Sequence, residues 1–255
     1  MTDTLSKKQK ASADFYGQYF WKDYEIEENA HLDFVIRGIG QENLENAQTL
    51  LDMGAGSGKF SILLKRRFPH LEITSVDLSP DNIATITRNA QMAQVNIAPQ
   101  QASVTDLPFE SNQFDLVLCV YMLQHTDAPA QGFAESARVL KSKGTSFYAI
   151  GCDNGLSNIH HGSRFFFNRV PAAWRKPSVY PLLPVYWALT HVLKSNKASY
   201  EELSKDLVDW LYNPLQNFVP KSDIQNWFAQ HNLDFEHLGY TGLFKSMMLC
   251  RGKKQ

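Results

Sequence analysis

Short apolar runs alternate with segments of helical periodicity through the first 150 residues. The runs rich in β-branched or aromatic residues lie at 49–51, 73–76, 114–120 and 145–150, and a weaker run that contains Pro99 lies at 97–102. Between them, apolar residues recur every three to four positions, which is typical of amphipathic helices. One helix is expected to begin with Ser79 as N-cap and Pro80 in its first turn; another spans 129–140 and ends in a turn at Lys143 and Gly144. Strands that alternate with helices in this order form a parallel sheet.

The end of the chain predicts one helix and two more strands. Residues 222–225 have the spacing of a capping box that would start the helix. Residues 233–238 and 246–250, on either side of Gly239 and Gly242, predict an antiparallel pair. The expected fold class is therefore α/β: a Rossmann-like, mostly parallel sheet of seven strands, with helices on both faces and an antiparallel terminal strand.

The alternation is interrupted at residues 151–220, which are irregular, aromatic and proline-bearing. We interpret this segment as a helical, aromatic insertion after the fifth strand that caps the substrate. The other expected parts are an N-terminal helical lid at 1–45, a cofactor-binding core at 46–150, and a C-terminal helix with strands at 221–255. The alternative for the aromatic residues is a small core of the insertion's own.

The composition favours a small-molecule partner. Lys and Arg number 25 and Asp and Glu 26, so no net field attracts nucleic acid or an anionic membrane to the whole chain. The longest apolar run, 179–193, contains two prolines and is too short to span a bilayer. Three cysteines without paired spacing predict no metal site and are typical of the cytoplasm. The sequence does not indicate an oligomeric state.

Residues 52–58 place glycines at positions 54, 56 and 58, directly after the first expected strand and before a helix. Glycine has no Cβ, so the backbone of such a turn passes close beneath a ligand. The free N–H groups at the start of the helix favour a carboxylate or a phosphate. Both a nucleotide and S-adenosylmethionine fit this pattern.

The spacing disfavours two other kinds of nucleotide site. A dinucleotide turn needs a third glycine where Lys59 stands, and the phosphate loop of nucleoside triphosphatases needs a hydroxyl where Phe60 stands. Asp77 follows the second strand, where an acid accepts hydrogen bonds from the two hydroxyls of a ribose. The alternative role of Asp77 is to cap the helix that starts near Ser79.

Four blocks of the sequence resemble the class I S-adenosylmethionine-dependent methyltransferases of small-molecule type. They are residues 50–58, 73–79, 106–109 with 114–117, and 138–141 with Gly144. The resemblance covers about residues 45 to 150 and identifies the cofactor better than the substrate. It implies that S-adenosylmethionine is bound by Asp52, Gly54, Ala55, Gly56, Gly58, Asp77, Leu78, Ser103, Val104 and Cys119.

The resemblance also implies a role for several of these residues. The glycines line the methionine end, Asp52 reaches the ammonium group directly or through water, and Asp77 holds the ribose. Relatives usually carry an acid after the third strand that contacts the adenine amine, but this chain has Ser103 there. Ser103 and the backbone of Val104 are expected to contact the ring instead. Cys119 opens a segment, 119–125, that flanks the adenosine.

No catalytic residue is assigned from the sequence. The sulfonium already carries a good leaving group, so positioning is the main requirement. Where the acceptor needs a base, the candidates are His160 and His161, with exposed loop positions as the alternative. His125 is interpreted as packing beneath the cofactor.

The expected function is methyl transfer to a small organic metabolite, with an oxygen or carbon acceptor slightly favoured. The alternatives are a non-catalytic S-adenosylmethionine-binding protein or partner subunit and, less favoured, an NAD-dependent Rossmann enzyme.

Overall fold

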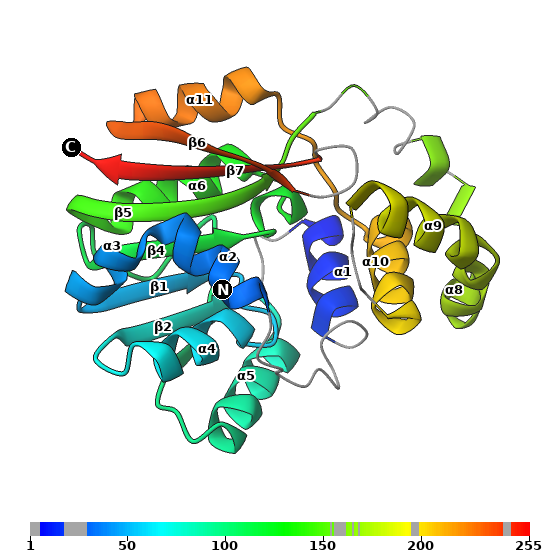
Figure 1. Cartoon of the computed structure of the whole chain (residues 1–255), viewed down its shortest axis with the longest axis horizontal. Coiled ribbons are helices and arrows are strands. Elements are labelled where there is room, and N and C mark those ends of the chain that lie inside the picture. Colours follow the sequence, from blue (N-terminus) through cyan, green and yellow to red (C-terminus); the bar gives the residue numbers. More distant parts are fainter. Residues whose placement is uncertain are drawn as a thin grey trace. The chain divides into compact units, whose positions relative to one another are not determined.

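The computed structural model describes residues 6–17, 30–153, 155, 162–164, 166–167, 169–194, 199–241 and 246–255. The chain divides into two compact units: Met1–Cys152 together with Leu215–Gln255, and Asp153–Pro214. We call the first the sheet unit and the second the helical unit (Figure 1).

A seven-stranded sheet in the order β3-β2-β1-β4-β5-β7-β6 forms the centre of the sheet unit (Figure 1). The strands are β1 (Thr49–Met53), β2 (Glu72–Asp77), β3 (Ala98–Gln101), β4 (Phe114–Val120), β5 (Leu140–Gly151), β6 (Leu233–Thr241) and β7 (Met247–Lys254). Strand β7 pairs antiparallel with both β5 and β6, and the other four pairs are parallel, so the predicted mostly parallel sheet is confirmed. The strand order reverses beside β1, and open α/β sheets bind ligands at the carboxyl end of such a switch point.

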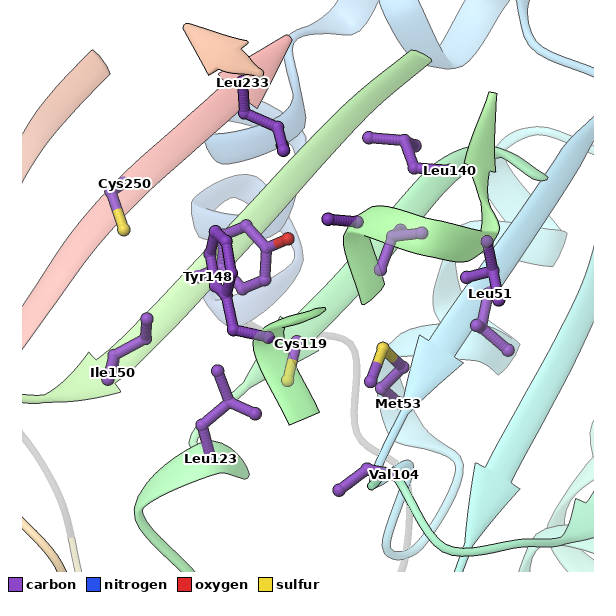
Figure 2. Close-up of a cluster of buried hydrophobic side chains, with 14 of the residues drawn as sticks. Leu51, Met53, Val104, Cys119, Leu123, Leu140, Tyr148, Ile150, Leu233 and Cys250 are labelled. Atoms are coloured by element: carbon purple, nitrogen blue, oxygen red, sulfur yellow. The ribbon is translucent and has the colours of Figure 1, made fainter. Parts of the chain in front are cut away.

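Helices cover both faces of this sheet, as predicted. The helices of the sheet unit are α1 (Lys7–Phe15), α2 (Ala30–Ile39), α3 (Gln41–Asn46), α4 (Lys59–Arg67), α5 (Pro80–Met92), α6 (Pro129–Val139) and α11 (Lys221–Gln230), with a short 3-10 helix η2 (Leu123–His125). Successive strand residues enter opposite cores because side chains alternate across a strand. Leu50 packs with residues of α2, α3 and α4, whereas Leu51 packs with residues of α6 and α11. Figure 2 shows the core that contains Leu51, where Tyr148 of β5 lies beside Cys119 of β4.

The ends of two predicted elements differ from the structure. The predicted turn at Lys143 and Gly144 lies within β5, which follows α6 directly at Leu140. Phe114 pairs with Leu140 and Leu116 with Thr145, so the intervening residues of β5 bulge out of register, and Lys143 has a φ of 64°. A bulge and a turn use the same residue types, so the sequence does not distinguish them.

The predicted capping box at 222–225 is wrong. Helix α11 starts two residues earlier than a capping box at Ser222 would place it, with Pro220 as its N-cap and no side-chain cap. The carbonyl of Pro220 accepts hydrogen bonds from the amides of Asp223 and Ile224 at 3.0 and 3.2 Å. Ser222 therefore lies inside the first turn, and its hydroxyl contacts the carboxylate of Asp223 instead.

The helical unit contains α8 (Ala172–Val179), a 3-10 helix η3 (Tyr180–Leu182), α9 (Leu183–Lys194) and α10 (Tyr200–Tyr212). Helix α10 packs against both α8 and α9. Its interior contains Val179 of α8, Leu183 of α9, and a buried apolar stripe of α10 formed by Leu203, Leu207 and Leu211. Among the described residues, no helix combines the length and apolar character needed to cross a bilayer.

Candidate functional site

The turn between β1 and α4 is held tightly against β2. Gly54, Gly56 and Gly58 have φ values of 75°, 57° and 78°, a region that residues with a Cβ adopt rarely. The amides of Gly54 and Ala55 both donate to the carbonyl of Val76, at 2.8 and 2.9 Å. The sequence therefore needs glycine here for backbone conformation as well as for space.

Met122, which follows β4, fills the space beside one of these glycines. A Cβ added to Gly54 would lie 2.4 Å from the Cγ atom of Met122 and 2.7 Å from its sulfur. The segment after β4 thus packs directly on the glycine turn. The sequence predicted close approach at Gly54 but attributed it to a ligand, because the partner side chain comes from a distant part of the chain.

Asp77 joins three parts of the site. Its Oδ2 accepts a hydrogen bond from the Gly56 amide at 2.9 Å. Its Oδ1 accepts from the Ser79 amide at 2.9 Å and from the Asn82 side chain at 3.0 Å. Burial raises the pKa of Asp77, and these hydrogen bonds oppose that shift. Asp77 thus orders the glycine turn and the start of α5 together, while Ser79 is the N-cap of α5 as predicted.

Asp52 lies at the end of β1 and is also buried. Its Oδ2 accepts a hydrogen bond from the Ser61 hydroxyl at 2.7 Å, and Ser61 in turn accepts from the Ser75 hydroxyl at 2.7 Å. Burial raises the pKa of Asp52 to about 7; the hydrogen bond from Ser61 lowers it and the nearby charge of Asp77 raises it further. The sequence showed Asp52 but neither its partner Ser61 nor Ser75, which donates to Ser61, because both are separated from Asp52 along the chain.

Two acidic side chains therefore lie close together at the carboxyl ends of β1 and β2. Asp52 and Asp77 are 3% and 9% exposed, and neither forms an ion pair with any residue that the structure describes. Buried carboxylates without a counter-charge are costly. The arrangement is suited to a ligand that brings positive charge and hydroxyl donors.

The remaining predicted cofactor residues differ in which of their atoms are available to a ligand. Ser103 is half-buried, and its hydroxyl lies 2.8 Å from that of Thr105. The carbonyl of Leu78 accepts a hydrogen bond from the Gln101 side chain at 3.1 Å. The side chains of Val104 and Cys119 belong to the core in Figure 2. Burial raises the pKa of the Cys119 thiol, so only backbone atoms of these two residues are suited to contact a ligand.

Tyr121 is a feature of the site that the sequence did not single out. It follows β4 with a φ of 58° and is 39% exposed, and its ring stacks on that of Phe34 at 6.2 Å between centroids. A non-glycine residue in this conformation is uncommon and often lies near a functional site. A positive φ at a tyrosine is not predicted by any pattern of residues in the sequence.

The two residues after α1 lie against two parts of the site. The Tyr16 ring meets that of His125 at 5.3 Å between centroids, and a Cβ on Gly17 would lie 2.2 Å from the Ser79 hydroxyl. His125 is 8% exposed, and its Nδ1 lies 3.0 Å from the carbonyl of Leu215. His160 and His161, the candidate bases, lie outside the described residues.

Residues 51–148 match the family of methyltransferase domains. This chain contains a class I S-adenosylmethionine-dependent methyltransferase domain. S-adenosylmethionine is its cofactor, and the match includes the glycine turn, both buried acids, Ser103 and Cys119.

Two relatives and one solved structure illustrate the similarity. A demethylmenaquinone methyltransferase of Deinococcus radiodurans is 33% identical over 95 residues, which cover 37% of this chain and 39% of the relative. A ubiquinone biosynthesis O-methyltransferase of Coxiella burnetii is 25% identical over 171 residues, covering 66% of this chain and 72% of the relative. The magnesium protoporphyrin IX methyltransferase of Synechocystis with bound S-adenosylmethionine has a TM-score of 0.61 and 12% identity, covering 100% of both chains. This chain thus spans about two-fifths of the first relative's length, and the solved structure shows that the fold is shared.

Proposed function

We propose that this protein transfers the methyl group of S-adenosylmethionine to a small organic acceptor. The observation that carries the proposal is the buried pair Asp52 and Asp77 beside the glycine turn, with no ion-pair partner among the described residues. S-adenosylmethionine brings an ammonium group, a sulfonium and a ribose diol, so it supplies the missing positive charge and hydroxyl donors in one molecule.

The residues present fit defined parts of the cofactor. We assign Asp52 to the ammonium group and Asp77 to the ribose hydroxyls. The turn Gly54–Gly58 lies beneath the methionine portion, and Ser103 with the backbone of Val104 lies beside the adenine. When bound, S-adenosylmethionine would supply a methyl group on a sulfonium, and S-adenosylhomocysteine would be its leaving group. The protein contributes alignment and exclusion of water, and no base is assigned.

The acceptor class is proposed from the relatives' names and from the composition of residues 151–220. One relative is named an O-methyltransferase of ubiquinone biosynthesis and the other a demethylmenaquinone methyltransferase, which supports an oxygen or carbon acceptor on an organic ring. The aromatic segment 151–220 remains our candidate for the substrate cap. A cytoplasmic location likewise remains a proposal based on cysteine usage.

Isotope transfer tests the proposed function. We expect the protein to convert methyl-labelled S-adenosylmethionine to S-adenosylhomocysteine, with the label appearing in quinols or hydroxylated aromatic acceptors analysed by mass spectrometry. Cofactor binding without transfer to these acceptors or to extracts of the source cells would favour the non-catalytic alternative. Binding of NAD instead would overturn the cofactor assignment.

The close approach of Gly17, which follows α1, to Ser79, the N-cap of α5, predicts that the N-terminal segment helps to retain the cofactor. Replacing Gly17 with valine places branched carbon against Ser79, so the end of α1 must move away. We expect S-adenosylmethionine to dissociate several-fold faster, because the site loses part of its cover. Stopped-flow displacement measures the rate. Ala11→Val, at an exposed position of the same helix, is the control; an equal effect from both variants would assign the change to α1 stability alone.

A further inference from the structure

Exposed large apolar side chains are concentrated in the helical unit. Of the eleven found among the described residues, nine belong to this unit: Phe166, Trp174, Tyr180, Leu182, Val185, Trp187, Leu189, Tyr200 and Trp210. Single exposed apolar residues are ordinary on protein surfaces, but a concentration on one small unit indicates a surface that binds something.

Helix α9 shows the concentration most clearly. Its inward face carries Leu183 and Thr190, which are buried. Its opposite face carries Val185 and Leu189, which are 64% and 38% exposed, and Leu182 precedes it in η3 with 39% exposure. A surface helix normally presents polar residues to water, whereas a helix that is apolar on both faces needs a second apolar environment.

The charge of this segment indicates what that environment is. Residues 154–200 contain six Lys or Arg residues and no Asp or Glu. In α8, Trp174 is 66% exposed and Lys176 is also exposed. The acidic residues of the unit lie outside this stretch, mainly in α10, where Glu201 pairs with Lys205 at 3.3 Å. The near-zero charge of the whole chain therefore conceals a basic segment.

We propose that the helical unit docks on the surface of an anionic phospholipid bilayer through α8, η3 and α9. Aromatic and aliphatic side chains would enter the interface while Lys and Arg contact lipid phosphates, which is the pattern of interfacial helices. A second copy of the chain is a poorer occupant, because a two-fold contact would bring two acid-free basic segments together. This attachment is peripheral, and it is separate from the methyl transfer proposed above.

Vesicle flotation without S-adenosylmethionine tests the docking proposal. We expect the partition coefficient to rise at least tenfold from vesicles of phosphatidylcholine alone to vesicles with 30% phosphatidylglycerol, and to fall at high salt. Val185→Glu combined with Leu189→Glu is expected to lower binding at least tenfold. The control is Met92→Glu, which changes a 72% exposed apolar residue of α5 in the sheet unit and is expected to leave binding unchanged.

Each other outcome overturns the proposal in a distinct way. Equal binding to neutral and anionic vesicles would show that charge does not contribute to binding. No binding to either kind of vesicle would show that the helical unit does not dock on a bilayer. Concentration-dependent dimers of the unmodified protein that Val185→Glu with Leu189→Glu dissociates, seen by light scattering, would identify a second copy as the occupant. Unchanged cofactor affinity in that double variant shows that it is folded and keeps this test independent of the proposed function.

Discussion

Replacing Asp77 with alanine is expected to weaken S-adenosylmethionine binding at least about a hundredfold. Two hydrogen bonds from ribose hydroxyls to a carboxylate are each worth roughly 1.5–3 kcal/mol, and every 1.4 kcal/mol is a factor of ten in affinity. The substitution also leaves the Gly56 and Ser79 amides without their acceptor. Isothermal titration calorimetry at pH 8 measures the loss.

Two further variants separate charge, shape and position. Asp81→Ala removes an exposed acid from the first turn of α5, so it changes the net charge equally and is expected to alter affinity less than twofold. Asp77→Asn keeps most of the side-chain shape and is expected to bind with intermediate affinity. Full affinity in Asp77→Ala would show that Asp77 serves the start of α5 alone, the role that its contacts with Ser79 and Asn82 also support.

The alternation of apolar runs was sufficient to predict the strands, most clearly for β1, β2, β4 and β5, which are largely buried. Even the third strand, which contains Pro99, was predicted, and its position at the edge of the sheet explains why a proline is tolerated there. The errors occur where the same residue types are compatible with two different backbone conformations. Lys143 and Gly144 suit both a turn and a bulge, and Pro220 and Ser222 both suit the start of a helix.

Only those residues of the candidate site that lie at the end of a predicted strand were identified from the sequence. Asp52 and Asp77 were identified because each lies at the carboxyl end of a recognisable strand. Their partners come from other elements: Ser61 from α4 and Asn82 from α5. Met122 reaches Gly54 only because β4 lies beside β1 in the sheet. Such contacts depend on strand order and register, which no local pattern contains.

The affinity for S-adenosylmethionine is expected to fall about tenfold for each pH unit below 7. The pKa of Asp52 is about 7 in the folded protein, and the proposed site binds the cofactor's ammonium group with the ionised form. Below that pH, binding must first remove a proton, so the apparent affinity follows the ionised fraction. Calorimetry between pH 5.5 and 8 in buffers of different ionisation enthalpy measures both the affinity and the proton released.

The same pKa makes the stability of the ligand-free protein fall as pH rises. An unfolded aspartic acid has a pKa near 3.9, so between about pH 4 and pH 7 the folded protein holds a proton that the unfolded chain has lost. The free energy of unfolding therefore declines through this window, by on the order of a few kcal/mol, and the loss is complete above pH 7. Thermal stabilisation by the cofactor is expected to be larger at pH 8 than at pH 6.

Asp52→Asn isolates the contribution of this one carboxyl group. The variant has no group to titrate at position 52, so its cofactor affinity is expected to be lower at pH 8 and nearly constant down to pH 6. Asp77, whose pKa burial also raises, remains in the variant, so any residual pH dependence reports Asp77. A variant that keeps the full slope of the unmodified protein would contradict the assignment of Asp52 to the ammonium group. A flat profile together with a raised melting temperature of the ligand-free variant at pH 8 would establish that the buried charge is kept for binding at a cost in stability.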